Sequence, residues 1–372
     1  MTKLKWRRTW FQVHKWIGLA LAILIIPLCI SGAALVWHDA LDRAVNPARF
    51  ATTGAAMVAP DRYVAAARAL AAPGERVAQL GYPEGKGPVT VSLAPGQAGP
   101  QRGGPPVRRV VYLDPPTARV LDVAASNTGI VRFFHVLHGS LQIGGGWGRS
   151  IVGWIGVAMM ISAFTGLWLW WPTVGSVKRA LRWGRHRNLD TNLHQTFGFW
   201  IALPLFVLSL TGAWISFPAF FNGLTGAVPQ RGPDRTMQAR ARPVEGTRFT
   251  VEQAVARAMA LQPGAVRSVT WPTEKKPDWT IQVGQGRGQP VSVADDSGVT
   301  ALPPEQVAQN ATMRWMRGVH EGSIGGPLWQ LLVFLGGLIP AGLAVTGVIM
   351  WWRARGWKGQ LAARQRAKAG ER

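Results

Sequence analysis

The sequence contains little cysteine and few motifs of soluble enzymes. Its one cysteine, Cys29, excludes an intramolecular disulfide and a paired-cysteine metal motif, and its place in an apolar run favours a packing role. The patterns H-E-x-x-H, G-x-S-x-G and G-x-x-x-x-G-K-[ST] are missing, so nothing indicates a hydrolase or a P-loop site. The short basic segments lack G-x-G-x-x-G and are too short for a nucleotide-binding domain.

Charge is also scarce, at 16% of 372 residues, whereas 48% are hydrophobic and 19 are tryptophan, which is typical of a membrane protein. Four stretches lack Asp, Glu, Lys and Arg and are long enough to cross a bilayer. The first is too long for the apolar core of a cleaved signal peptide and recurs in mid-chain, so we interpret it as a retained helix. We expect transmembrane helices at Trp16–Trp37, Ser150–Trp171, Gln195–Pro218 and Pro327–Trp352.

The net charge of +23 is concentrated in three short segments. Residues 1–15, 172–193 and 353–372 hold 17 Lys and Arg against two acids, whereas the long segments 38–146 and 221–326 are only mildly basic. The positive-inside rule then places both termini in the cytoplasm and both long segments outside. A nucleic-acid partner is not expected, because the basic residues flank apolar helices and form no soluble basic face.

The apolar segments at the start and middle of the chain are copies of each other. The first begins H-K-W-I-G and ends S-G-A, and the second begins H-Q-T-F-G and ends T-G-A. A helix that only had to cross a membrane would need no histidine, since ionisable groups at membrane depth are costly and usually functional. An offset of 180 residues relates three pairs: His14 and His194, Gly18 and Gly198, and Gly32 and Gly212.

The remaining parts of the two halves also correspond. His138 stands in L-H-G-S-L before a segment ending T-G-L-W-L-W-W, and His320 stands in V-H-E-G-S-I before one ending T-G-V-I-M-W-W. The offset is 182 residues at these histidines, and Glu321 is an insertion. The chain therefore reads as a tandem duplication of helix, long segment, histidine and helix.

The expected organisation follows from this repeat. It consists of a cytoplasmic N-terminus with the first helix (1–37), a first outer domain (38–146), a second helix (147–171), a basic cytoplasmic loop (172–193), a third helix (194–220), a second outer domain (221–326), a fourth helix (327–352) and a basic cytoplasmic tail (353–372). The fold class is a mostly α membrane protein with a four-helix bundle and two small α+β extracytoplasmic domains.

Each long segment is predicted to contain one helix followed by a short antiparallel meander. The Pro/Gly-rich stretches 94–106 and 230–243 are expected to be loops or linkers. In the first segment the helix is predicted at 61–71 and strands at 77–82, 89–93, 107–113 and 119–123. In the second the helix is predicted at 250–261 and strands at 266–271, 279–283, 290–293 and 299–302.

The sequence resembles proteins with PepSY-associated transmembrane helices, which include inner-membrane ferric-siderophore reductases and iron-regulated membrane proteins. The resemblance covers nearly the whole chain except the basic C-terminal tail. It is carried by H-K-W-I-G at His14, L-H-G-S-L at His138, T-G-L-W-L-W-W-P at Thr165, V-V-Y-L-D-P-P-T-A-R-V-L at Val110 and V-S-V-A-D-D-S-G-V-T-A-L at Val291. It implies PepSY-like outer domains, a bacterial inner-membrane location and a ferric siderophore as substrate.

Paired histidines at two membrane levels predict haem. Four-helix bundles build cofactor sites from residues on facing helices, and two histidines at one level match the two axial positions of haem iron. We therefore expect two haem b groups, with His14 and His194 as ligands near the cytoplasmic side and His138 and His320 near the outer side. Glycines on the histidine face (Gly18, Gly32, Gly198 and Gly212) would let a flat macrocycle approach the backbone, although close helix packing is an alternative use.

Other polar residues leave alternatives open. His38 and His135 have no repeat partner and could be polar residues at helix ends or ligands, and His186 is expected to be a solvated residue of the basic loop. Outer arginines could attract an anionic iron complex or could be plain surface charge: Arg108, Arg109, Arg314 and Arg317.

The favoured function is a haem-containing reductase that passes electrons across the inner membrane, reduces a ferric siderophore in the periplasm and releases Fe(II). The electron donor would be a quinol, a reduced flavin or a reductase protein, since the chain has no nucleotide domain of its own. One alternative is a non-redox envelope sensor or peptidase regulator anchored by its helices. Another is a transporter, which is disfavoured because the repeats are parallel and no span contains an acidic residue.

Overall fold

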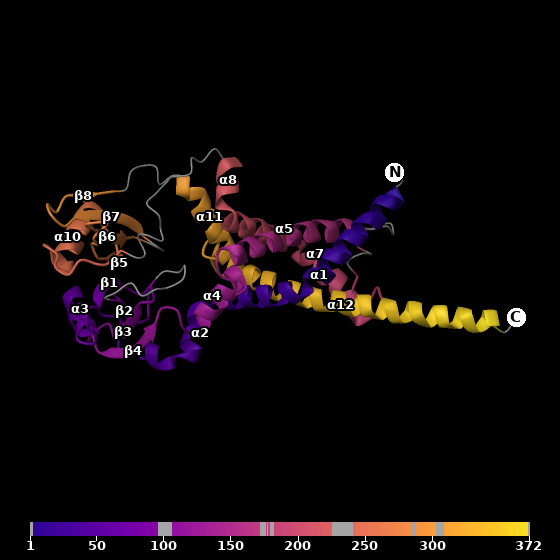
Figure 1. Cartoon of the computed structure of the whole chain (residues 1–372), viewed down its shortest axis with the longest axis horizontal. Coiled ribbons are helices and arrows are strands. Elements are labelled where there is room, and N and C mark those ends of the chain that lie inside the picture. The colour runs from indigo at the N-terminus through magenta and orange to yellow at the C-terminus, as the bar shows by residue number, and fades with distance from the viewer. Residues whose placement is uncertain are drawn as a thin grey trace. The chain divides into compact units, whose positions relative to one another are not determined.

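The computed structural model describes residues 3–95, 106–171, 176, 178, 182–224, 241–284, 288–302 and 309–370. The chain divides into two compact units (Figure 1). The helical unit comprises residues 1–38, 133–228 and 311–372, and the sheet unit comprises residues 39–132 and 229–310. Most of the two Pro/Gly-rich stretches predicted as loops lies outside the described residues.

Four long helices form the core of the helical unit: α1 (Lys3–Val36), α5 (Trp147–Trp170), α7 (Leu189–Ser216) and α12 (Gly326–Gly370). All four are long and apolar enough to cross a membrane, and they contain the four predicted spans to within two residues. Large apolar side chains such as Ile23 (79% exposed) and Leu203 (71% exposed) point away from the bundle, as is expected of surfaces in contact with lipid.

The helices α1 and α7 lie on opposite sides of the bundle. Helix α1 packs against α5 and α12, and α7 packs against the same two helices. The first and third spans therefore face each other across the centre of the bundle. A buried apolar cluster fills the interior, and Cys29 belongs to it, which confirms the packing role of that residue.

Two amphipathic helices carry the second pair of repeated histidines. They are α4 (Ile130–Ser140) and α11 (Gln309–Glu321), which lie in the long segments 38–146 and 221–326 but were not predicted as helices there. The turns that follow them adopt positive φ angles, at Leu141 (51°) and Gln142 (60°) after α4 and at Gly322 (80°) after α11. The main part of each helix belongs to the helical unit, so the divisions between units fall near residues 133 and 311 and not at the expected 146 and 326.

The sheet unit contains the helices and strands predicted for the two long segments, each within three residues of its expected bounds. The first segment supplies α3 (Pro60–Arg68), β1 (Arg76–Gly81), β2 (Val89–Ala94), β3 (Arg109–Leu113) and β4 (Val120–Ala125). The second supplies α10 (Val251–Leu261), β5 (Val266–Thr270), β6 (Asp278–Val283), β7 (Gln289–Ala294) and β8 (Thr300–Ala301). Helix α10 begins with a capping box between Thr250 and Gln253.

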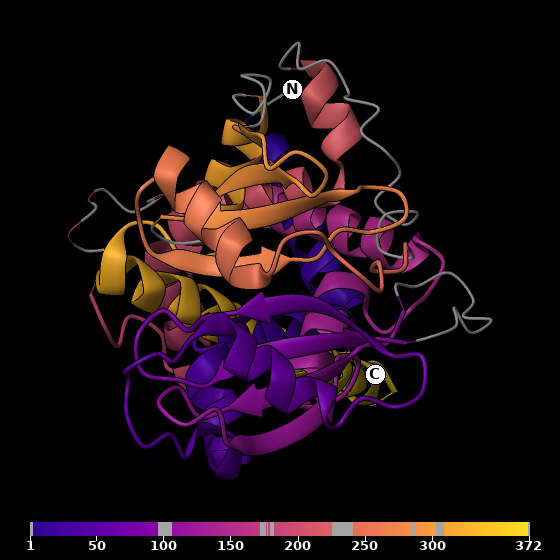
Figure 2. The same cartoon turned by 90° about the vertical axis from the view of Figure 1, so that its left-hand side faces the viewer.

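The two meanders join into one antiparallel sheet, where two separate small domains were expected. The strand order is β4-β3-β2-β1-β5-β6-β7-β8, and β1 pairs with β5 between Gln79 and Thr270. Figure 2 shows the strands of the first segment, in indigo to magenta, beside those of the second, in orange. Pairing these first strands covers an edge that each meander would otherwise leave open. The helices α3 and α10 pack against the sheet and each other, and the shared core includes the buried rings of Tyr63 and Trp279.

The short helices α2 (His38–Val45) and α8 (Pro218–Leu224) follow α1 and α7, respectively, and a 3-10 helix spans Pro47–Phe50. A short helix thus follows each of these two spans. The two short helices differ in sequence, because His38 begins α2 whereas Pro218 begins α8.

Candidate functional site

His14 of α1 and His194 of α7, the first histidine pair, face each other across the bundle. Their ring centres are 6.3 Å apart and the ring planes are nearly perpendicular, at 88°. An imidazole nitrogen binds a metal at about 2 Å and lies roughly 1 Å from its ring centre, so two imidazoles on opposite sides of one metal ion have ring centres about 6 Å apart. The spacing of the first pair therefore fits two axial ligands of one metal.

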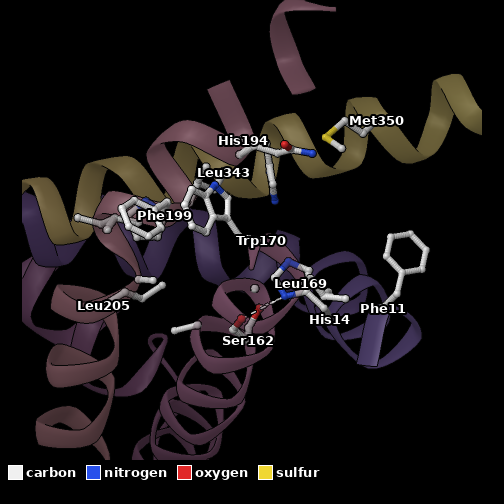
Figure 3. Close-up of a pocket in the computed structure, with 18 of the residues that line it drawn as sticks. Phe11, His14, Ser162, Leu169, Trp170, His194, Phe199, Leu205, Leu343 and Met350 are labelled. Atoms are coloured by element: carbon white, nitrogen blue, oxygen red, sulfur yellow. Dashed lines mark hydrogen bonds between the residues drawn. The ribbon is translucent and has the colours of Figure 1, made fainter. Parts of the chain in front are cut away.

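A cavity of about 780 Å³ adjoins the first pair (Figure 3). Its volume lies within the range of about 300–1,000 Å³ that is typical of ligand and cofactor pockets. Gly18 and Gly198 line it, and a Cβ added to Gly18 would meet nothing within 4 Å, so this backbone is open to a flat ligand. The stacked rings of Trp170 and Phe199, with centres 4.0 Å apart, supply an aromatic wall.

Three arginines also line this cavity: Arg7, Arg8 and Arg185. Arg7 donates to the carbonyl oxygens of Leu169 and Trp171 at the end of α5. Cations beside an apolar cavity suit a ligand with an apolar body and carboxylate groups. Haem has this chemistry, so the histidines, the open glycines and the arginines together fit a haem.

His14 is held by a helical turn of α5 that ends in Thr-Gly. A Cβ added to Gly166 would lie 3.0 Å from Cε1 of His14, so the ring occupies the space that a side chain would take. The Nδ1 of His14 lies 3.1 Å from the carbonyl oxygen of Ser162 and 3.2 Å from Oγ1 of Thr165. The turn thus provides both room and hydrogen-bond acceptors for the imidazole.

The same arrangement holds His194 against α12. A Cβ added to Gly347 would lie 3.4 Å from Cε1 of His194, and Nδ1 of His194 lies 3.0 Å from Oγ1 of Thr346. We call this element, in which a serine or threonine precedes a glycine under a histidine ring, the Ser/Thr-Gly turn. Gly166 and Gly347 were not predicted as site residues from the sequence.

His138 of α4 and His320 of α11, the second histidine pair, have ring centres 6.0 Å apart and an interplanar angle of 37°. Each ring packs on a Ser/Thr-Gly turn near the end of α1 or α7. A Cβ added to Gly32 would come within 2.6 Å of Cε1 of His138, and one added to Gly212 within 3.0 Å of Cε1 of His320. Gly32 and Gly212 thus make room for histidine rings of the second pair, whereas from the sequence they were expected to let a flat macrocycle approach the backbone or to allow close helix packing.

The acceptors of the second pair repeat those of the first. The Nδ1 of His138 lies 2.8 Å from the carbonyl oxygen of Leu28. The Nδ1 of His320 lies 3.0 Å from the carbonyl oxygen of Leu208 and 3.0 Å from Oγ1 of Thr211. All four histidines therefore pack on an equivalent turn, each contributed by another helix.

These hydrogen bonds determine which ring nitrogen is free. Carbonyl oxygens only accept hydrogen bonds, so Nδ1 carries the hydrogen in His14, His138 and His320. In His194 the partner of Nδ1 is the hydroxyl of Thr346. This hydroxyl donates to the carbonyl oxygen of Gly342, so it accepts from Nδ1. The Nε2 lone pair is then available, as in metal-binding histidines that donate their other N–H to a carbonyl. Burial lowers the pKa of His138, and lowers that of His320 to about 4, so both rings are neutral.

The remaining polar residues of interest make local contacts. His186 is not a freely solvated side chain: its Nε2 lies 2.8 Å from Oε1 of Gln195. Arg109 is engaged with Glu75 in the sheet unit, and Arg317 pairs with the inserted Glu321 at 3.7 Å. Within the described residues, no group of three or more His, Cys, Asp and Glu side chains could hold a metal ion.

A family model described as PepSY-associated TM region matches residues 11–354. The chain belongs to this family, which confirms the resemblance, and the matched region includes all four paired histidines and their Ser/Thr-Gly turns. The comparison with curated proteins gave no match. Four apolar helices and this family assignment together make the chain a multi-pass membrane protein.

Proposed function

We propose that this member of the PepSY-associated transmembrane family is a haem b protein of the bacterial inner membrane that carries electrons outward to a ferric siderophore. The observation that supports it best is the pair of facing histidines at each of two levels of the bundle, with ring centres 6.3 Å and 6.0 Å apart. One structural role at one helix contact would not require four histidines with the same hydrogen bonding. With one haem bound at each pair, all four histidines would have the same role, as ligands of haem iron.

The separation of the two pairs suits transfer across the membrane. Leu28, whose carbonyl accepts from His138, follows His14 by 14 residues on α1. At 1.5 Å per residue this is about 21 Å along the helix, most of the roughly 30 Å of a bilayer core. The buried cluster on this part of the bundle is apolar and includes Ile25, Met159 and Cys29.

A haem bound at each pair would supply one-electron transfer. The chain's own residues orient the imidazoles and leave room for such a haem. The Ser/Thr-Gly turns fix the imidazole orientation and keep Nε2 free, and Gly18 and Gly198 leave the cavity wall open. Arg7, Arg8 and Arg185 provide positive charge beside the cavity of the first pair.

The substrate part of the proposal comes from the family resemblance. One electron converts the ferric ion of a siderophore into Fe(II), which oxygen ligands hold less tightly, so iron can be released. The donor would be a quinol, a reduced flavin or a reductase protein on the cytoplasmic side. We place the termini in the cytoplasm and the sheet unit in the periplasm from the distribution of lysine and arginine. We also infer that the two halves arose by tandem duplication.

The test is an absorption spectrum of the protein purified from haem-replete cells, before and after addition of dithionite. We expect two haem b groups per chain, with the spectrum of iron bound by two histidines. A chelator of Fe(II) then measures ferrous release when reduced protein is mixed with a ferric siderophore. A colourless preparation would refute the redox function and leave the sensor or regulator.

A further inference from the structure

A third pair of histidines lies in the helical unit outside the four already described. His38 is the first residue of α2, directly after α1, and His135 is on α4. Their ring centres are 6.3 Å apart, the same spacing as in the first pair, with an interplanar angle of 56°. We propose that His38 and His135 form a third metal site, which binds an exchangeable divalent transition-metal ion.

The exposure of this pair distinguishes it from the haem ligands. The side chains of His38 and His135 are exposed, whereas those of His138 and His320 are partly covered by the turns that hold them. A solvent-accessible pair suits a metal ion that enters and leaves, and water or other small ligands can complete its coordination. A resident macrocycle would instead require an enclosing cavity.

The third pair also breaks the internal repeat. At the positions that correspond to His38 and His135, the second half has Pro218 and Arg317, neither of which is a metal ligand. The pair therefore gives the two halves different chemistry at one end of the bundle. His135 precedes His138 by three residues, so the two are neighbours on the surface of α4, and the third site adjoins the second histidine pair.

The geometry indicates which metals fit. A spacing of 6.3 Å matches that of two imidazoles on opposite sides of a metal, whereas a tetrahedral angle would bring the ring centres to about 5 Å. Imidazole suits Fe, Ni and Cu ions, and sites with trans nitrogen ligands are octahedral or tetragonal. Two protein ligands give moderate affinity, as release of a metal requires. If the proposed function holds, the physiological ion is the Fe(II) product, and this identification alone rests on that proposal.

The test measures Cu(II) binding to the full-length, oxidised protein purified without a polyhistidine tag. Copper is the probe because Cu(II) binds nitrogen sites most tightly among the divalent first-row ions. Electron paramagnetic resonance and metal analysis report the copper bound and its nitrogen ligands. The variants are His38→Ala, His135→Ala, their combination, and His135→Arg, which introduces the residue of the second half. His186→Ala controls for the loss of a histidine as such.

We expect the wild type and His186→Ala to bind one more equivalent of Cu(II) than any of the variants at 38 or 135. Each single variant should weaken this site by about tenfold or more, and the double variant should lose no further equivalent. Anaerobic Fe(II) should compete for the same equivalent. Unchanged Cu(II) binding in the variants would overturn the proposal, as would a loss of haem from His38→Ala or His135→Ala. Binding needs no electron transfer, so the site can be found even if the reductase function fails.

Discussion

The imidazole of His138 occupies the space that a side chain at Gly32 would need. A Cβ at Gly32 would lie 2.6 Å from Cε1 of His138 and 2.9 Å from its Nδ1. The contact joins residues more than 100 positions apart, one on α4 and one on α1. It explains why glycine stands at this point of α1, and it makes the glycine a positioning residue for the proposed haem ligand.

Gly32→Ala should therefore displace His138. Overpacking of this kind costs about 1–3 kcal/mol, and here the ring must give way. We expect loss of the haem at the second pair while the haem at the first pair remains, measured by haem content and reduced spectrum. Gly342→Ala on α12 is the matched control, because a Cβ there meets nothing within 4 Å. Equal haem content in both variants would contradict this role of Gly32.

His14→Ala and His194→Ala should remove the same haem, because their rings face each other across one site. Haem content should fall by about one group per chain in either variant, and no further in the double variant. The measurement is haem quantified per protein beside a check that the variants remain folded. Additive losses would mean that the two histidines do not share an iron.

His138→Ala or His320→Ala should abolish reduction of an external ferric complex while the haem of the first pair stays reducible from the cytoplasmic side. The reason is that the second pair is the proposed exit for electrons. The assay reads ferrous-chelator signal and haem spectrum on the same sample. Normal ferrous release in both variants would argue against a haem at this pair, and loss of both haems would indicate misfolding.

Thr346→Val should weaken the first haem site although no ligand is removed. The Oγ1 of Thr346 accepts from Nδ1 of His194, and such supporting partners change metal affinity by about 10–100-fold. Thr346→Ser, which keeps the hydroxyl, should retain wild-type affinity in a haem-transfer titration. If valine and serine behave alike, the hydroxyl has no part in orienting His194.

Topology can be tested with reporters fused to truncated chains. A reporter that is active only in the periplasm should be active after Gly246 and silent after Gly184, because the short segments hold most of the positive charge. The reverse pattern would put the sheet unit in the cytoplasm. Substrate reduction would then occur on the wrong side for the proposed function.

Local patterns in the sequence determined much of this protein. Runs without charge predicted the four spans, alternating residues predicted the strands, and the 180-residue offset identified His14, His194 and the accompanying glycines. These features depend on residues close to one another in the chain, where helix and strand periodicities are fixed by backbone geometry. The family resemblance has the same basis, since it rests on short motifs in a given order.

The tertiary structure alone decided which distant segments meet. Helix periodicity in the sequence placed Gly32 on the same face of α1 as His14. Because α4 packs on α1, however, the ring that lies against Gly32 is that of His138. The pairing of β1 with β5 and the approach of His38 to His135 were equally invisible, because neither has a local signal. Such contacts depend on how whole helices and strand edges pack together, which the spacing of residues within one element does not specify.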